Sequence, residues 1–222
     1  MQESIPIGKP CQPRLDPPSA DPRRCHPPKP LGILAFGSLI SEPGSEIEPQ
    51  IRMRIRTTTP FPVEYARISA TRGGAPTLVP HESGAPVSAQ ILVLDGGLSV
   101  EDAQDMLWRR ETRNVGTGKK YPGGSGPNAV LVAKTKDPRV ETVLCTDFNP
   151  EGKVKRPTAQ ELAKKAIESV GKAKAGMDGI SYLIDAIAAG IETPLTTTYK
   201  AEILKQTGTV SLEGALRKAK SP

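Results

Sequence analysis

Short apolar runs, several of them alternating with polar residues, predict six β-strands in this chain. The first run, LGILAF at residues 31–36, has the length of a buried strand. Several of the other runs are rich in β-branched residues and are bounded by Gly or Pro clusters. The expected strands cover residues 32–36, 51–56, 63–69, 87–94, 129–134 and 141–146.

Capping residues and apolar spacing predict four helices. Ser99 and the acids that follow it form a capping-box-like start for a helix over residues 100–110. Thr158 begins a second helix over residues 159–170, and further helices are expected over 179–189 and 212–219. The order strands, helix, strands, helices predicts an α+β fold with a barrel-like mixed sheet, and disfavours a doubly wound sheet.

The first 30 residues differ in composition from the rest of the chain. They contain nine prolines and no apolar periodicity, and proline disfavours both helix and strand pairing. We interpret residues 1–30 as an extended or disordered arm, with an ordered strap across the domain as the alternative. Residues 31–222 are interpreted as one globular domain.

The net charge of +6 raises the question of a nucleic-acid partner. The densest basic cluster, Arg52, Arg54 and Arg56, alternates with apolar residues, which is typical of a half-buried strand with an arginine face. A phosphate-binding patch is the alternative. Aromatic residues make up only 4% of the chain, which weighs against single-strand binding by stacking, so no nucleic-acid partner is expected.

Other classes of protein are disfavoured by what the sequence contains. We expect no membrane partner, because no apolar run approaches the ~20 residues of a membrane helix, and no secretory signal is recognisable. Three widely spaced cysteines do not form a disulfide framework, so a reducing, cytoplasmic location is expected. With two histidines, a histidine-based metal site or triad is hard to build, and carboxylates remain for acid–base chemistry.

Two separated features favour a binding site. The first strand ends at Gly37 and Ser38, where the backbone can turn tightly and direct N–H groups at an anion. Glu111 follows Arg109 and Arg110 at the end of the first helix, before a glycine-rich segment over 116–126. Alone, each feature has an ordinary structural interpretation, as a strand-ending turn and a surface glutamate. Together they supply a base and an anion cradle.

Four short motifs in order resemble the ChaC-type γ-glutamylcyclotransferases. These motifs are AFGSLI, RISATRGG, RRET and SYL, and the resemblance covers residues 31–189. It implies the γ-glutamylcyclotransferase fold, a mixed β-barrel with flanking helices. It also implies an enzyme that releases 5-oxoproline from a γ-glutamyl amide, a small-molecule substrate, without a metal or other cofactor.

The same resemblance implies roles for individual residues. Glu111 occupies the catalytic acid/base position. The substrate-binding residues are Phe36, Gly37, Ser38, Leu39, Ile40, Arg72, Tyr121 and Tyr182. Three of these have a structural alternative: Arg72 as part of a hairpin turn, Tyr121 as a loop anchor, and Tyr182 as a core residue.

The chain also departs from the family pattern. Phe36 stands where the family has a tyrosine, and Ser41 stands where glutathione-specific members tend to have tryptophan. The segment from Glu111 to Tyr121 is longer than usual and carries Lys119 and Lys120. These departures leave the γ-glutamyl substrate open. A catalytically silent member of the fold, acting as a ligand-binding or regulatory module, is the alternative function.

Limited proteolysis tests the arm. Residues 1–30 are expected to be trimmed without loss of the folded domain, because their prolines remove backbone donors and fix φ. The measurement is the unfolding transition of the trimmed protein, compared with that of the full chain. Loss of cooperative unfolding on removal would show that the arm is structural.

Overall fold

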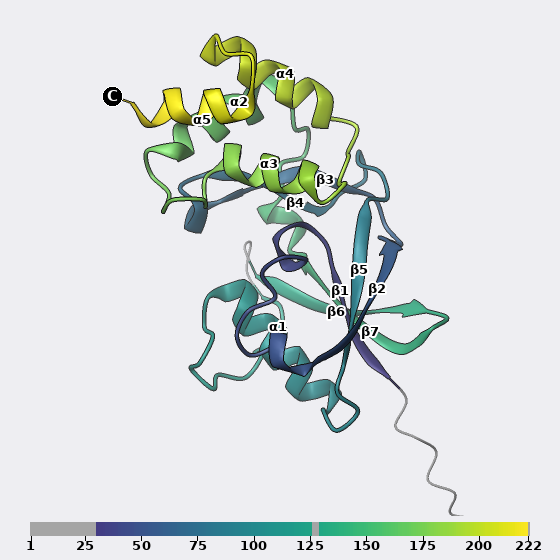
Figure 1. The fold of residues 1–222 in the computed structure, drawn as a ribbon. Helices are drawn as coiled ribbons and strands as arrows, with labels where there is room; N and C mark the ends of the chain where they lie inside the picture. Colours follow the sequence, from purple (N-terminus) through teal and green to yellow (C-terminus); the bar gives the residue numbers. More distant parts are fainter. Residues whose placement is uncertain (1–29, 126–128, 222) are drawn as a thin grey trace, which may run out of the picture.

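The main feature of the fold is a five-stranded mixed sheet around the apolar first strand. The computed structural model describes residues 30–125 and 129–221. Its strands are β1 (Leu31–Ala35), β2 (Ile51–Thr58), β5 (Ser88–Leu94), β6 (Val130–Asp137) and β7 (Val140–Phe148), in the order β2-β5-β1-β7-β6. All five residues of β1 are buried, and this strand runs antiparallel to β5 and parallel to β7. The predicted α+β fold with a mixed sheet is confirmed (Figure 1).

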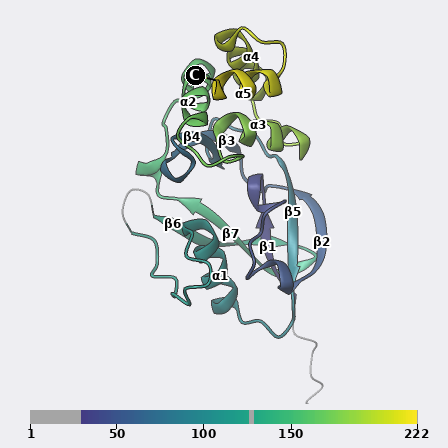
Figure 2. The same ribbon diagram turned by 60° about the vertical axis from the view of Figure 1, so that its left-hand side comes forward.

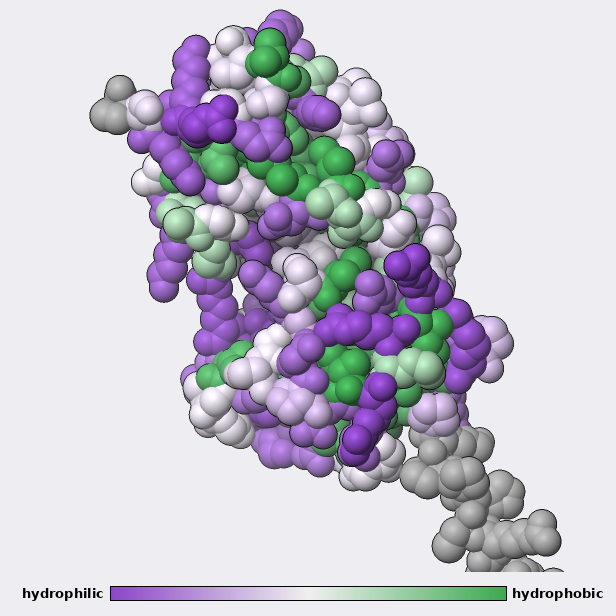
Figure 3. All heavy atoms as spheres, viewed as in Figure 1, coloured by the Kyte–Doolittle hydropathy of each residue, from purple (hydrophilic) through white to green (hydrophobic). Residues whose placement is uncertain are grey.

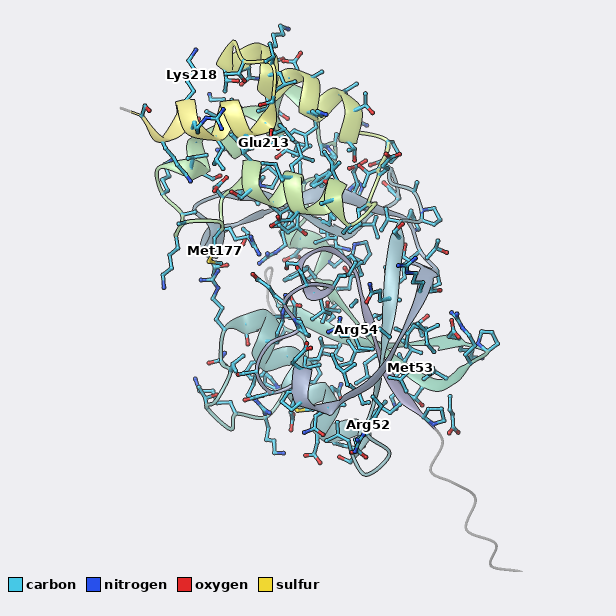
Figure 4. The ribbon with its side chains drawn as sticks, viewed as in Figure 1. Arg52, Met53, Arg54, Met177, Glu213 and Lys218 are labelled. Carbon is cyan, nitrogen blue, oxygen red and sulfur yellow. The ribbon has the colours of Figure 1, made fainter. Side chains whose placement is uncertain are left out.

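The predicted barrel is not seen in the strand pairing. Among the described residues, β2 pairs only with β5 and β6 pairs only with β7, so the sheet has two edges. The arginines of β2 lie on one of these edges, where Arg52 pairs with Asp95 and Arg54 pairs with Glu48. Figure 3 shows strongly hydrophilic residues over this face, and Figure 4 labels Arg52 and Arg54 there. Charged edge residues oppose pairing with a further strand.

A separate hairpin carries the remaining strands. β3 (Val63–Ser69) and β4 (Ala75–Pro80) pair antiparallel and are joined by a short turn over Ala70–Arg72. β4 was not among the expected strands, because Pro76 and Pro80 argue against a strand. A two-stranded hairpin tolerates them, since each strand has one unpaired edge.

Helix α1 (Val100–Thr112) packs on the large sheet. Ser99 caps it by accepting a hydrogen bond from the Asp102 N–H, as predicted. Leu107 and Met106 join Ile33 and Leu144 in the core beneath it. The helix contacts β6 and β7, and Arg110 in its last turn donates to Ser38 in the loop after β1.

The other four helices gather over the β3–β4 hairpin (Figures 1 and 2). They are α2 (Ala159–Val170), α3 (Gly179–Ala188), α4 (Thr196–Thr207) and α5 (Leu212–Lys220). Their core contains three tyrosines: the Tyr65 ring lies edge-on to the rings of Tyr182 and Tyr199, with centroids 6.4 Å and 5.1 Å away. The sequence did not predict α4, which begins with three threonines, poor helix formers. Burial of Tyr199 and Ile203 holds this helix in place.

The other element predictions agree with the structure to within a few residues. All six expected strands and all four expected helices are present. Phe36, expected to end the first strand, instead lies just after β1 and before the short turn Gly37–Leu39. Residues 1–29 of the expected arm lie outside the described residues. No helix in the described ranges is long and apolar enough to cross a membrane.

A close contact between α2 and α3 gives a stability prediction. A Cβ at Gly179 would lie 2.7 Å from Ala166 Cα and 2.8 Å from Ala166 Cβ, so one helix would have to move. Gly179→Ala should therefore lower the free energy of unfolding by about 1–3 kcal/mol.

Gly171→Ala is the matched control for this pair of helices. Gly171 has φ −80° and no atom within 4 Å of an added Cβ, so this change should be neutral or stabilising by about 0.5 kcal/mol. Denaturant unfolding measures both variants. Equal stabilities would contradict the packing described for α2 and α3.

Candidate active site

A cavity of about 580 Å³ lies where the end of α1, the loop after β1, the β3–β4 hairpin and α3 meet. The ionisable side chains other than tyrosine that line it are Glu42, Arg67, Arg72, Arg110, Glu111 and Arg113. Elements from both halves of the fold supply its walls. The cavity is therefore formed only when the large sheet and the helical group are in place.

Most of the residues singled out from the sequence meet in this cavity. Phe36, Ser38, Leu39, Arg72, Glu111 and Tyr182 all line it. Gly37 lies directly behind the lining, because a Cβ there would be 2.6 Å from the Tyr182 hydroxyl oxygen. Its φ of +59° is a left-handed conformation that favours glycine. The loop residues and Glu111, separated by about 70 positions in sequence, therefore share one cavity.

Glu111 is held in the cavity by its neighbour Arg110. Arg110 Nη1 donates to Glu111 Oε1 at 2.6 Å, and both side chains are only 15% exposed. In this mostly buried position the ion pair is screened less by water than a surface pair. The carboxylate is thus fixed at the end of α1, with one side toward its cation.

The same guanidinium also holds the loop after β1. Arg110 Nη2 donates to Ser38 Oγ at 3.2 Å and to the Glu42 carbonyl oxygen at 2.8 Å. Within the loop, the Glu42 N–H donates to the Ser38 carbonyl oxygen at 2.9 Å. A single side chain therefore fixes the position of Glu111 relative to the Gly37–Ser38 turn.

Tyr182 and Arg72 line the cavity and also make contacts that support the fold. The Leu78 N–H donates to the Tyr182 hydroxyl at 3.3 Å, and the Arg72 guanidinium lies 4.9 Å from the centre of the Tyr182 ring. Burial raises the pKa of Tyr182 above its ordinary value, so this phenol stays neutral. Arg72 ends the turn between β3 and β4, as its structural alternative predicted, and still reaches the cavity.

Two predicted substrate-binding residues are not brought to the cavity. Ile40 packs on the apolar cores and is not part of the lining. Tyr121 anchors its loop on β6, where its hydroxyl accepts from the Val132 N–H at 3.1 Å and its own N–H donates to Asp105 Oδ1 at 2.7 Å. This is the loop-anchor alternative. Arg109, which also precedes Glu111, pairs instead with Glu46 at 2.8 Å.

Sequence reasoning missed three charged residues of the cavity: Glu42, Arg67 and Arg113. Arg67 is the most informative of them. It lies in β3, most of which is buried, and its guanidinium carbon lies 3.9 Å from the centre of the Phe148 ring. An arginine inside an otherwise buried strand was the available signal, because such a residue is rarely buried without a purpose.

The described part of the chain contains no group of three or more His, Cys, Asp or Glu residues placed to hold a metal ion.

Comparison with known proteins gives a likeness at the level of the fold. No protein-family model and no curated protein matches the sequence. Among solved structures, the chain is similar to a γ-glutamyl cyclotransferase from yeast described as specific to glutathione, with a TM-score of 0.52 and 15% sequence identity. The match covers 80% of this chain and 99% of the yeast chain. At this identity the likeness shows a shared fold, in agreement with the resemblance seen in the motifs.

The bonds of Arg110 predict that the loop over residues 37–42 opens more readily when this side chain is replaced. In Arg110→Met, amide hydrogen exchange over residues 37–42 should become faster, because the loop loses its bonds at Ser38 Oγ and the Glu42 carbonyl oxygen. The free energy of unfolding should fall by about 1–3 kcal/mol, since Glu111 is left mostly buried without its donor.

Arg56→Met, on the exposed face of β2, is the control and should change neither quantity. Unchanged exchange over residues 37–42 in Arg110→Met would contradict the role of Arg110 in holding this loop.

Proposed function

We propose that this chain is a γ-glutamylcyclotransferase that releases 5-oxoproline from a γ-glutamyl amide, with Glu111 as the acid and base. The observation that carries this proposal is the meeting of Glu111 with the Gly37–Ser38 loop in one cavity. Such a site brings a carboxylate that can accept a proton and the backbone of the Gly37–Ser38 turn to one cavity. The shared fold with a yeast cyclotransferase adds support.

The proposed reaction begins with proton transfer to Glu111. The substrate's α-amino group is protonated in water and must lose a proton before its nitrogen can attack the γ-carbonyl carbon. Attack forms the C–N bond of the five-membered lactam, and the bond from the same carbon to the leaving nitrogen then breaks. Glu111 returns the proton to that nitrogen, and the new lactam nitrogen gives up its second proton, which protonates the freed amine. The products are therefore 5-oxoproline and an ammonium ion, with no water consumed.

The cavity's second task is to keep the substrate folded. Attack is intramolecular, so holding the amine against the carbonyl supplies much of the rate enhancement. In this proposal the turn at Gly37 and Ser38 binds the α-carboxylate or the oxyanion through its backbone N–H groups. Phe36, Leu39, Arg72 and Tyr182 form the surrounding walls. Because Phe36 has no hydroxyl, this position contributes shape and apolar surface only.

Arg110 has a positioning role in this mechanism. Its bond to Glu111 Oε1 occupies one carboxylate oxygen, so the other oxygen remains to accept the substrate's proton. Its bonds to Ser38 Oγ and the Glu42 carbonyl oxygen keep the turn facing that carboxylate. The distance between base and anion cradle is therefore set by one rigid guanidinium group.

Replacement of the proposed base tests the function. Glu111→Gln keeps the volume and an acceptor for Arg110 but cannot take up a proton. Release of 5-oxoproline from a panel of γ-glutamyl amides, glutathione included, should fall about 10²–10⁴-fold. Ligand binding and the unfolding transition should remain close to those of the wild type.

Glu101→Gln, an exposed residue in the first turn of the same helix, is the matched control and should retain full activity. Near-normal turnover by Glu111→Gln would overturn the assignment. Binding without turnover by the wild type would favour the catalytically silent alternative.

A further inference from the structure

A methionine joins two walls of the cavity. Met177 lines it from the turn before α3, where the Met177 N–H donates to the Lys174 carbonyl oxygen at 2.9 Å. Arg113, the residue that caps the end of α1, also lines the cavity. Arg113 Nη2 donates to Met177 Sδ at 3.5 Å (Figure 4). The end of α1 and the segment that leads into α3 therefore meet at this sulfur atom.

The backbone of Arg113 has an uncommon conformation. Its φ of +58° is left-handed, and no other non-glycine residue in the described ranges has a positive φ. Its N–H donates to the carbonyl oxygens of Arg109 and Arg110, a pattern that usually ends a helix at glycine. An arginine here has a conformational cost that glycine avoids, and its side chain makes the contact with Met177.

The acceptor at this contact is weak although the donor is strong. Thioether sulfur is a weak acceptor, and its bond with Arg113 is the only hydrogen bond of that guanidinium within the described part of the chain. A second guanidinium approaches the same residue, because Arg72 Nη1 makes a long contact of 3.5 Å to the Met177 carbonyl oxygen. Charged donors from two elements therefore gather around Met177.

Oxidation of the sulfur would supply the better acceptor. When a peroxide oxidises a thioether, the sulfur lone pair attacks one peroxide oxygen and the O–O bond breaks. Sulfur loses two electrons, and with hydrogen peroxide the departing hydroxide takes up a proton and leaves as water. The product is a polar sulfoxide, whose oxygen can accept a charge-assisted hydrogen bond of about 2.8 Å from a guanidinium group.

Access also favours oxidation at this position. Met177 is partly exposed and Met53 in β2 is 54% exposed, whereas Met106 lies under α1 and is 8% exposed. Cys145 is buried, and burial raises the pKa of its thiol to about 11, so the reactive thiolate is scarce. Within the described ranges, peroxide should therefore act first on Met53 and Met177.

We propose that Met177 is a site of reversible oxidation that controls access to the cavity, a regulation that rests on the proposed function. In the sulfoxide form, the new oxygen binds the Arg113 guanidinium. Because both residues line the cavity, this bond draws the end of α1 and the segment before α3 together and opposes entry of the γ-glutamyl amide. Enzymatic reduction of the sulfoxide releases the bond and restores access.

Peroxide treatment followed by a turnover assay tests this proposal. The substrate is γ-glutamyl-alanine, which has no thiol to consume peroxide, and dithiothreitol added after treatment reduces oxidised cysteines. When mass spectrometry shows complete oxidation of Met177, kcat/KM for 5-oxoproline release should be about 3- to 10-fold lower than before treatment, as for one added hydrogen bond. Methionine sulfoxide reductases for both epimers should restore it.

Three variants, each compared with its own untreated sample, identify the residues responsible. Met53→Leu, on exposed β2, should lose as much activity on treatment as the wild type, and Met177→Leu should lose none. Arg113→Leu keeps the oxidisable sulfur but not the guanidinium, so its loss should stay below about twofold. A wild type that keeps full activity with Met177 oxidised, or a Met177→Leu that loses activity like the wild type, would overturn the proposal.

Amide hydrogen exchange separates this proposal from the proposed function. Oxidation should slow exchange over residues 112–117 and 174–180 in the wild type and leave it unchanged in Arg113→Leu. If the untreated wild type releases no 5-oxoproline from any amide of the panel, the cyclotransferase assignment fails. Slower exchange in the oxidised wild type would then still support the closure of the cavity at Met177, and unchanged exchange would overturn it.

Discussion

The site depends on the three-way contact of Arg110. This guanidinium joins the last turn of α1, through Glu111, to the loop after β1, through Ser38 Oγ and the Glu42 carbonyl oxygen. The loop and the glutamate belong to separate segments of the chain, and Arg110 is hydrogen-bonded to both. The core under α1 holds the end of the helix in place. The bonds of Arg110 then fix the distance between Glu111 and the loop after β1 across the cavity.

The contacts of the other arginines in the cavity are not explained by folding stability alone. Arg67 has a buried, unpartnered Nε, and Arg72 makes only ring and long carbonyl contacts. Folding alone does not favour part-buried cations without ion-pair partners. Their retention is consistent with a site that gives up some stability for ligand recognition. In the proposed function, the paired Arg110 orients the base.

The sequence was informative where local chemistry determines structure. The buried run of β1, the Ser99 cap and the spacing in α2 and α3 were readable, and so was the meeting of Glu111 and the Ser38 turn in one cavity. The strand β4 and the helix α4 were not, because Pro76 and the threonines at the start of α4 oppose the conformations that tertiary packing imposes. Arg67 was missed, although an arginine within a mostly buried strand was the available signal, which the exposed β2 around Arg54 does not share. Tyr121 fits a family position by order along the chain, but its loop folds back onto β6.

The most direct test of this account is a crystal structure of Glu111→Gln with γ-glutamyl-alanine bound. The account predicts the γ-glutamyl group between the Gly37–Ser38 turn and the side chain at position 111, with the α-amino nitrogen close to that side chain. Density for the ligand outside this cavity, or with its γ-glutamyl group turned away from position 111, would contradict the account.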